Sequence, residues 1–262
     1  MKTMGNDLVL AERVTQLNRE NVRRLIEARL RTLSSGLEIA IELEAIPANG
    51  FVRIAVEGPD TEVFTELVKR KVGLAPSRLS DIEVNDNFRA YVSKIDSAQQ
   101  SIRIELGPTS KDLRSEITRE ALSAQLCDGR AVPVDKVAQT YCLQEGVPVF
   151  VRVTCIDPDR GRIEAWVSDD QVSRFDEWRR QRLHRIIAVG GFQEKLQEAV
   201  RLSKVERDVA DVEQLAWTSH SLVCKLGTDA PGIIAKIGRY LSDVRLYAFV
   251  PQKVDKLRFS FA

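Results

Sequence analysis

The sequence predicts a multidomain α+β protein, because helical and strand-like hydrophobic patterns alternate along its 262 residues and no single period runs throughout. Residues 145–168 alternate apolar and polar side chains on both sides of an Asp-Pro-Asp-Arg-Gly turn, which is typical of a β-hairpin. Residues 222–250 are expected to form a strand, a capped turn, a helix and another strand. We therefore expect three domains, at residues 1–80, 81–172 and 173–262.

The first domain is predicted to follow the order β-α-β-β-α. A strand is expected at residues 8–10, and Asn18 stands in an N-cap position before apolar residues at helical spacing. Residues 37–43 and 51–56 are predicted strands of an antiparallel hairpin, and Asp60 is expected to cap a second helix. Both helices should cover one face of the sheet. The arginines of the first helix are interleaved with glutamates, a pattern that more often marks a solvated surface than a phosphate site.

The second domain is predicted to be a small β-barrel with a helical insertion. Two strands should come first, then two helices, and the hairpin described above should close the domain. The expected elements are strands at 88–95 and 101–106, a helix capped by Ser110 or Asp112 that ends at Asp128-Gly129, and a helix at 135–141.

The closing hairpin resembles the S-one type of OB-fold, a module widespread in RNA-binding and translation proteins. The residues that fit its pattern are Gly146, Val149, Val151, Val153, Ile156, Asp157, Arg162, Ile163 and Ser168. Residues 108–144 depart from that module, because they are longer, helical and lack its histidine. The resemblance implies a barrel that binds single-stranded RNA on one face.

Strand alternation assigns side chains to the two sides of this barrel. The residues expected inside are Val92, Ile102, Ile104, Val149, Val151, Val153, Ile163 and Val167. Those expected on the outer side are Arg89, Tyr91, Arg103, Phe150, Arg152, Arg162 and Trp166. Arginines beside aromatic rings suit single-stranded nucleic acid, because bases stack on the rings while guanidinium groups pair with phosphates. The alternative is that the aromatic rings pack beneath the helical insertion or another domain.

The third domain is predicted to join a helical part to an α/β part. A helix at 173–187 should present a basic patch that holds RNA phosphates, formed by Arg179, Arg180, Arg182 and Arg185 together with Arg174. A second helix is expected at 192–204. Further on, Thr228 or Asp229 should cap a helix with Pro231 in its first turn, and free N–H groups there could hold an anion at Thr228, Asp229 and Gly232. The Asp229 to Gly232 stretch also resembles the first turn of the amino-acid-sensing ACT module, although a capped structural helix is the simpler reading.

Residues 222–234 and 244–249 resemble an archaeal family known only as a domain of unknown function, and the similarity extends to the Phe-x-x-Trp helix entry at Phe175 and to Gly190. This resemblance implies an archaeal, intracellular protein and no particular activity. The order of barrel, helical part and α/β part is also similar to the alpha subunit of translation initiation factor two. That likeness is one of layout alone, so it does not assign a function.

Composition argues against several classes of function. The formal net charge is only +1, although residues 217–262 carry seven lysines and arginines against three aspartates. The four cysteines are scattered, which disfavours a zinc site or disulfides, and the two histidines lie far apart in sequence without metal-ligand spacing. No apolar run is long enough to cross a membrane, and no signal peptide is recognisable, so we expect a cytoplasmic protein without cofactor or metal.

These observations predict a non-catalytic RNA-binding protein in archaeal translation or RNA processing. Its expected partner is single-stranded or structured ribosomal or transfer RNA, with the ribosome or another large assembly as a further partner. Two alternatives remain open. One is a ligand-responsive regulatory protein that binds a small carboxylate at the C-terminal turn, and the other is a scaffold that docks on a ribosome or polymerase through protein contacts.

Overall fold

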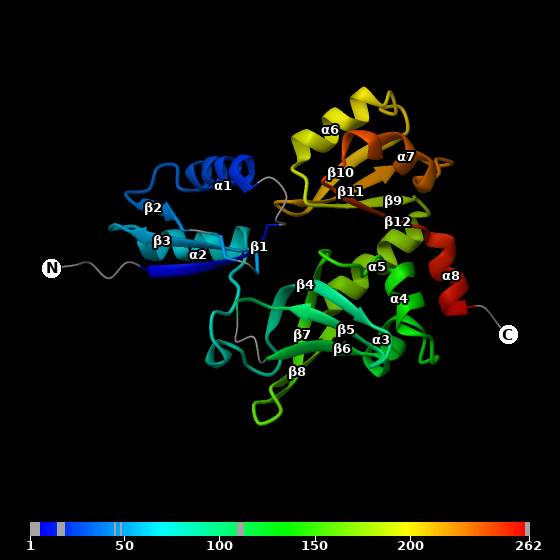
Figure 1. Cartoon of the computed structure of the whole chain (residues 1–262), viewed down its shortest axis with the longest axis horizontal. Helices are drawn as coiled ribbons and strands as arrows, with labels where there is room; N and C mark the ends of the chain where they lie inside the picture. The colour runs from blue at the N-terminus through cyan, green and yellow to red at the C-terminus, as the bar shows by residue number, and fades with distance from the viewer. Residues whose placement is uncertain (1–5, 15–18, 45, 48, 109–112, 260–262) are drawn as a thin grey trace. The chain divides into compact units, whose positions relative to one another are not determined.

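The computed structural model describes the chain except for residues 1–5, 15–18, 45, 48, 109–112 and 260–262. It divides into two compact units, Met1–Asp81 with Leu106–Ser110, and Ile82–Glu105 with Lys111–Ala262. Helices and strands are mixed in both units (Figure 1), so the predicted α+β class is confirmed. The finer division into three domains stays a prediction. Among the described residues, no helix combines the length and apolarity that a membrane crossing requires.

The first unit is a three-stranded antiparallel sheet with two helices. The strand order is β1-β3-β2. On β3, Val52, Ile54 and Val56 alternate with less buried residues, and each of the three is fully buried. On α1, Val22, Ile26 and Leu30 recur every four residues and are also buried. The buried residues of β3 thus follow the period of a strand, and those of α1 follow the period of a helix. The elements are β1 (Asn6–Arg13), α1 (Arg19–Leu33), β2 (Ala40–Leu43), β3 (Phe51–Glu57), α2 (Thr61–Lys71) and the short 3-10 helix η1 (Leu79–Asp81).

The predicted N-cap Asn18 lies outside the described residues. The predicted cap of the second helix, Asp60, precedes α2 but makes no side-chain hydrogen bond to its first turn. Its carboxylate instead accepts the backbone N–H of Glu38 at 2.8 Å, which ties the start of α2 to the segment that leads into β2.

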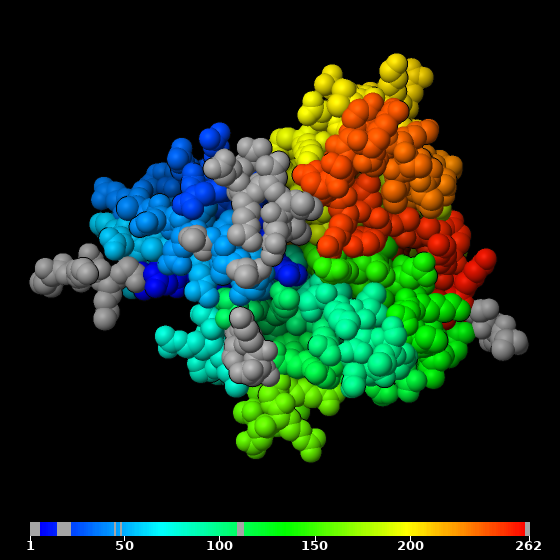
Figure 2. Space-filling view, viewed as in Figure 1, coloured from blue at the N-terminus to red at the C-terminus, as the bar shows by residue number. Residues whose placement is uncertain are grey.

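The second unit begins with five strands that close into a barrel in the order β4-β5-β6-β8-β7. Strand β7 pairs back to β4, and the only parallel neighbours among these five strands are β6 and β8. All eight residues predicted to lie inside are at most 4% exposed, so the predicted alternation is confirmed for the interior. The turn between β7 and β8 projects from the barrel (Figures 1 and 2). The strands are β4 (Asn87–Asp96), β5 (Ser101–Glu105), β6 (Arg114–Thr118), β7 (Pro148–Asp157) and β8 (Arg162–Val167).

The predicted helix after residue 110 is wrong in its first half. Residues 114–118 form the third barrel strand, and helix α3 (Arg119–Leu126) begins only after Thr118, whose hydroxyl accepts the N–H of Ala121 at 3.3 Å. The strand was missed because two of its inward or covered positions are polar, Ser115 and Glu116, so its pattern looks like the polar start of a helix. The expected caps Ser110 and Asp112 lie outside the described residues. Helix α4 (Val134–Thr140) follows close to its predicted position.

A four-stranded antiparallel sheet in the order β10-β11-β9-β12 completes this unit. One face packs on α6 and α7 through an apolar core that includes Ile186, Leu196, Leu222 and Ile233. The other elements of this part are α5 (Asp169–Gln181), β9 (Arg185–Val189), α6 (Gln193–Leu202), β10 (Val209–Ala216), β11 (Ser219–Cys224), α7 (Ala230–Ile237), the 3-10 helix η2 (Gly238–Tyr240), β12 (Arg245–Phe249) and α8 (Pro251–Phe259).

An aromatic cluster links the barrel's helices to this sheet. Phe175 of α5 lies 5.1 Å from Tyr141 and 5.9 Å from Trp178 between ring centroids, and Trp178 meets Phe249 of β12 edge-on at 5.3 Å. Burial of these rings stabilises the contact between α5 and β12.

The predicted helix over residues 173–187 is also too long. Helix α5 ends at Gln181, because Arg182 adopts the left-handed conformation with φ of 59°, and residues 185–189 form strand β9. All five residues of β9 are buried. A strand covered on both faces shows no alternation, so its apolar run cannot be distinguished from the end of an apolar helix by pattern.

Candidate nucleic-acid interface

The outer face of strands β5, β6 and β8 carries predicted arginines, but carboxylates pair with them. The Nη2 of Arg103 donates to Asp96 at 2.7 Å. Arg162 lies 2.7 Å from Glu116 and 3.2 Å from Glu164. The Ser101 hydroxyl donates to the same Glu116 at 2.7 Å. These ion pairs leave the face with little free positive charge.

The pKa of Asp96 shows the same neutralisation. The backbone N–H of Gln99 and the guanidinium of Arg103 both hold that pKa below its usual range. The carboxylate is therefore ionised at neutral pH and bound to its arginine, so a phosphate would have to displace it. This makes the face of β5 and β6 a poor phosphate site.

A different flank of the barrel, formed by β4, β7 and β8, combines rings and cations, and we call it the Trp166 flank. Strand register places Asn87, Arg152 and Trp166 side by side in one row across the three strands. Trp166 is 39% exposed, whereas Trp178 and Trp217 are 4% and 7% exposed. Arg152 bonds to Asp169 at 3.1 Å, but that aspartate is 79% exposed, so the pair contributes little and can rearrange. Trp166 and Arg152 thus lie outward, as predicted.

The adjacent pair of the same flank joins one ring to two cations. Arg89 and Phe150 are opposite each other in the register of β4 and β7, and the guanidinium of Arg89 lies 5.4 Å from the ring centroid. Arg174 of α5 brings a second guanidinium to 5.5 Å from the same ring. Both contacts are in the range of cation–π attraction.

Arg174 makes no ion pair with an acidic side chain anywhere in the described ranges. Burial lowers the pKa of its guanidinium, the nearby Glu213 carboxylate opposes this shift, and the nearby Arg89 lowers the pKa further. An anion between these two guanidiniums would relieve their repulsion. The Phe150 end of the flank is thus suited to a phosphate and its Trp166 end to a base.

Tyr91 is the outward residue that the structure contradicts. It is only 1% exposed, so the prediction of an accessible ring at this position is wrong. Strand alternation identifies the side of the sheet on which a residue lies, and it does not say whether that side is covered.

Most arginines of the predicted basic patch in the third domain are bound to other residues of the chain. Arg179 bonds to Asp255 at 3.2 Å, and Arg182 bonds to the same carboxylate. Arg185 is 1% exposed and belongs to β9 rather than to the helix. Arg180 is exposed and bonds to a backbone carbonyl of its own helix. Of the four predicted phosphate contacts in this patch, Arg180 alone is exposed and without an ion pair in the described part of the chain.

The predicted anion site at the start of α7 is occupied by a carboxylate of the chain itself. Asp229 is the N-cap, and its side chain accepts the N–H of Gly232 at 2.9 Å. The N–H of Ala230 points to Nδ1 of His184 at 3.3 Å. Thr228 lies in the turn before the cap. A negative charge already at the helix N-terminus repels a second anion there.

No group of three or more histidine, cysteine, aspartate or glutamate side chains with metal-binding geometry occurs in the part of the chain that the structure describes. His184 hydrogen-bonds to Gln252 at 3.2 Å, and His220 is fully buried on β11. The two histidines therefore belong to different local environments.

Residues 183–246 match the family model of the DUF2110 C-terminal domain. This match confirms the predicted resemblance to an uncharacterised family, in the segment where it was expected. No curated protein matches the chain.

Two solved structures show partial likeness. The uncharacterized protein MJ1198 from Methanocaldococcus jannaschii is 12% identical, with 34% of this chain and 95% of that chain covered and a TM-score of 0.24. A chain of the a/eIF2alpha-aDim2p-rRNA complex from Pyrococcus horikoshii OT3 is 16% identical, with 48% of this chain and 62% of that chain covered and a TM-score of 0.26. TM-scores this low do not establish a shared fold, so the assignment of function must come from the geometry.

Proposed function

We propose that the barrel is an OB-fold and that the protein is a non-catalytic RNA-binding protein that holds single-stranded RNA on the Trp166 flank. Strand order and pairing support the fold: the first strand neighbours the second and the fourth, and the third lies parallel to the fifth. A five-stranded Greek-key barrel with oligonucleotide-binding loops is the OB arrangement. The resemblance of the closing hairpin to the S-one module supports a role in translation or RNA processing.

The observation that carries the proposal is an exposed ring beside several arginines, of which Arg174 makes no ion pair with a described residue. Trp166 offers its face for base stacking, which contributes about 1–3 kcal/mol per base. Arg174 and Arg89 at the Phe150 ring, with Arg152 between them and Trp166, offer phosphate contacts along the same flank. On the face of β5, β6 and β8, by contrast, Arg103 and Arg162 are already bound to carboxylates.

A small-carboxylate sensor is less well supported. Its proposed site would use the N-terminus of α7, and the Asp229 carboxylate already occupies that position. The Asp169 carboxylate at the Trp166 flank pairs with Arg152, but it is 79% exposed, so a phosphate can displace it more easily.

Fluorescence anisotropy with a labelled oligouridine of about 12 nucleotides tests the proposal, since such a length covers one OB barrel. We expect Trp166→Ala to weaken binding about 10- to 100-fold and Trp166→Phe to weaken it much less, because phenylalanine keeps a stacking face. Arg174→Ala should reduce the slope of log affinity against log salt by about 0.7.

The matched control is Arg114→Ala, which removes an exposed arginine from β6 on the other side of the barrel. It should leave the affinity unchanged. Equal binding by Trp166→Ala and the unaltered protein would refute the proposal, and so would a loss confined to Arg114→Ala.

A further inference from the structure

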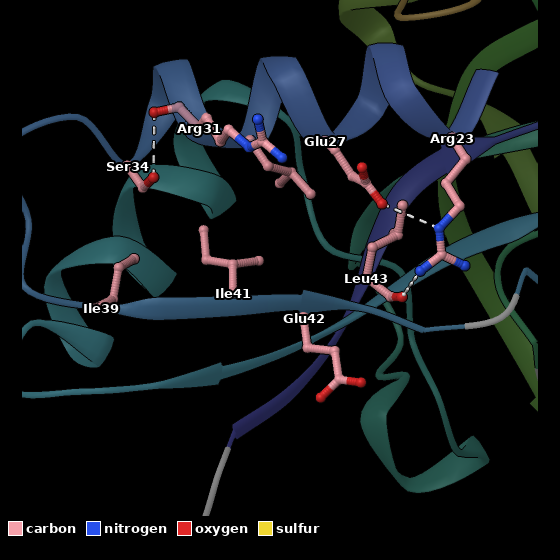
Figure 3. A pocket seen from close by; sticks show the side chains of 9 residues that line it. Arg23, Glu27, Arg31, Ser34, Ile39, Ile41, Glu42 and Leu43 are labelled. Atoms are coloured by element: carbon pink, nitrogen blue, oxygen red, sulfur yellow. Dashed lines mark hydrogen bonds and ion pairs between the residues drawn. The ribbon is translucent and has the colours of Figure 1, made fainter. Parts of the chain in front are cut away.

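A pocket of about 400 Å³ lies between helix α1 and strand β2 in the first unit, far in sequence from the barrel. We call it the α1–β2 trough. Its upper side is one stripe of α1, and its floor is the apolar side of β2 (Figure 3). The residues that line it are Arg23, Glu27, Leu30, Arg31, Ser34, Ile39, Ile41, Glu42 and Leu43.

The floor of the trough presents backbone groups of an open sheet edge. Strand β2 is the last strand in the order β1-β3-β2. Glu44 lies opposite Arg53, and its N–H donates to the Arg53 carbonyl at 3.0 Å, which makes this a hydrogen-bonded pair. Antiparallel pairs alternate, so Leu43 and Ile41 must point their N–H and C=O groups away from β3.

One contact confirms this direction of the backbone groups. The Nη2 of Arg23 donates to the carbonyl oxygen of Leu43 at 2.7 Å from outside the sheet. The N–H of Leu43 and both backbone groups of Ile41 have no such partner among the residues that the structure describes. Three hydrogen-bonding groups therefore point outward along the open edge of β2, beside the trough.

The other edge of the same sheet differs from β2. Strand β1 is covered by the segment after α2, where Ala11 donates to the Gly73 carbonyl and Ala75 donates to the Val9 carbonyl, both at 2.9 Å. An uncovered edge exposes the chain to unwanted pairing, and proteins usually protect it. The open edge at β2, with an apolar floor and an overhanging helix, has the form of a site for an added strand.

The charges of the trough define what such a strand should carry. Arg23 pairs with Glu27 at 3.0 Å, so these two charges cancel. Glu42 points to the opposite side of the sheet from Ile41 (Figure 3). Arg31 makes no ion pair with any described residue, and it leaves one net positive charge on the helix side of the trough.

We propose that the α1–β2 trough binds an extended segment of a partner protein, which adds to β2 as a fourth strand. Alternate side chains of the segment are apolar and pack on Leu30, Ile39 and Ile41. At least one acidic residue of the segment meets Arg31. Main-chain hydrogen bonds to Ile41 and Leu43 supply affinity, and the apolar floor and the cation supply specificity.

Selection from a displayed library of random octapeptides against the full-length protein tests this. The enriched sequences should alternate apolar residues and contain aspartate or glutamate. A synthetic copy of the most enriched peptide is then titrated into the protein, and amide exchange is followed by NMR. Exchange at Ile41 and Leu43 should slow, while exchange in the barrel should not change.

Two pairs of variants separate strand addition from other binding. Ile41→Pro removes the outward N–H of the edge strand and keeps an apolar side chain, a change that an edge strand tolerates, and Ile41→Val keeps the N–H with a slightly smaller side chain. Arg31→Glu reverses the free charge, and Arg24→Glu reverses a charge of the same helix that does not line the trough. We expect Ile41→Pro and Arg31→Glu each to weaken the affinity for the peptide more than tenfold. The two control variants should bind the peptide about as tightly as the unaltered protein does.

Three results would overturn the proposal. The first is that the library yields no peptide that the unaltered protein binds more tightly than Arg31→Glu does. The second is that the peptide still binds to Ile41→Pro. The third is that the peptide slows amide exchange at residues outside the trough. A pocket that takes small molecules instead would give the first of these. Because Arg31→Glu changes an exposed side chain, its fold is expected to persist even if Ile41→Pro destabilises the sheet.

Discussion

Arg185 shows how far a single residue can depart from what its type suggests. It is the largest fully buried side chain, and its guanidinium lies 4.7 Å from the Trp178 ring centroid. It also bonds to Glu213 at 2.6 Å, to Gln181 at 2.5 Å and to the Ser221 hydroxyl at 3.2 Å. A buried charge with this many partners is a structural contact between α5, β9 and β10 and has no free donor face for RNA.

Arg185→Ala should therefore destabilise the fold and not simply weaken RNA binding. We expect a loss of about 3 kcal/mol in the free energy of unfolding, because Glu213 and Gln181 would lose their cation. Urea denaturation measures this. Arg180→Ala, which removes a neighbouring exposed arginine, should change the same quantity by less than about 0.5 kcal/mol. A loss below about 1 kcal/mol for Arg185→Ala would show that the buried network is not structural.

Two glycines give a matched prediction about backbone conformation. Gly146, before β7, has φ of 86°, and a Cβ there would lie 2.9 Å from Cγ1 of Val189. Gly238, after α7, has φ of −56° and open space around its Cβ position. We expect Gly146→Ala to lower the unfolding free energy by about 2 kcal/mol and Gly238→Ala to raise it by about 0.5 kcal/mol. Equal effects in thermal or urea denaturation would contradict the assigned conformations.

The four cysteines should differ sharply in reactivity. Burial raises the pKa of Cys142 to about 12 and those of Cys127 and Cys224 to about 11, so these thiols stay protonated at pH 8. Cys155 on β7 is exposed. A thiol reagent at pH 8 should modify one cysteine quickly in the folded protein and four after denaturation, and Cys155→Ser should abolish the fast reaction. Fast modification of a second cysteine would contradict the burial of the others.

At the scale of elements, a strand could be predicted from the sequence where its apolar and polar residues alternate clearly. Strand β7 alternates as far as Val153, where its pairing with β8 shifts register, and β8 alternates throughout, so that their interior residues are those expected. Strand β6 has polar residues at buried positions, because Glu116 is bound to Ser101 and Arg162 on the covered outer side. Its burial depends on partners far away in sequence, and no local pattern contains that information.

The boundary between α5 and β9 could not be predicted for a related reason. Residues 183–189 are apolar enough to continue a helix, and the break depends on the left-handed conformation of Arg182. Arginine carries no local preference for that conformation, unlike glycine or asparagine. Arg185, after the break, thus lies on a buried strand and not on a helix face, and it is lost from the predicted phosphate patch.

At the scale of the whole molecule, counting charges along the sequence overestimates free positive charge. Ion pairs between the α5 region and α8 bind cations of both segments, because Asp255 holds Arg179 and Arg182, and Asp176 holds Arg258. What could be predicted of the candidate site was the outward position of Arg152 and Trp166. What could not be predicted was Arg174 at the Phe150 ring, because this contact needs the packing of α5 against β7.

RNA affinity should depend on salt to a limited extent if the Trp166 flank is the site. Three arginines, Arg89, Arg152 and Arg174, could contact phosphates, and so the slope of log affinity against log salt should be about −2. Titrations between about 50 and 200 mM salt measure it. A slope several times steeper would require a larger basic surface than this flank provides.

The most direct test of the proposed RNA-binding flank uses Trp166 itself. Of the three tryptophans in the sequence, Trp166 is far more exposed than the other two, so a base that stacks on it should change the emission of the protein. We predict that an oligouridine of about 12 nucleotides quenches this emission to saturation and that Trp166→Phe abolishes the quenching while retaining most of the affinity. Binding seen by anisotropy with unchanged tryptophan emission, or no binding at low salt, would contradict the account.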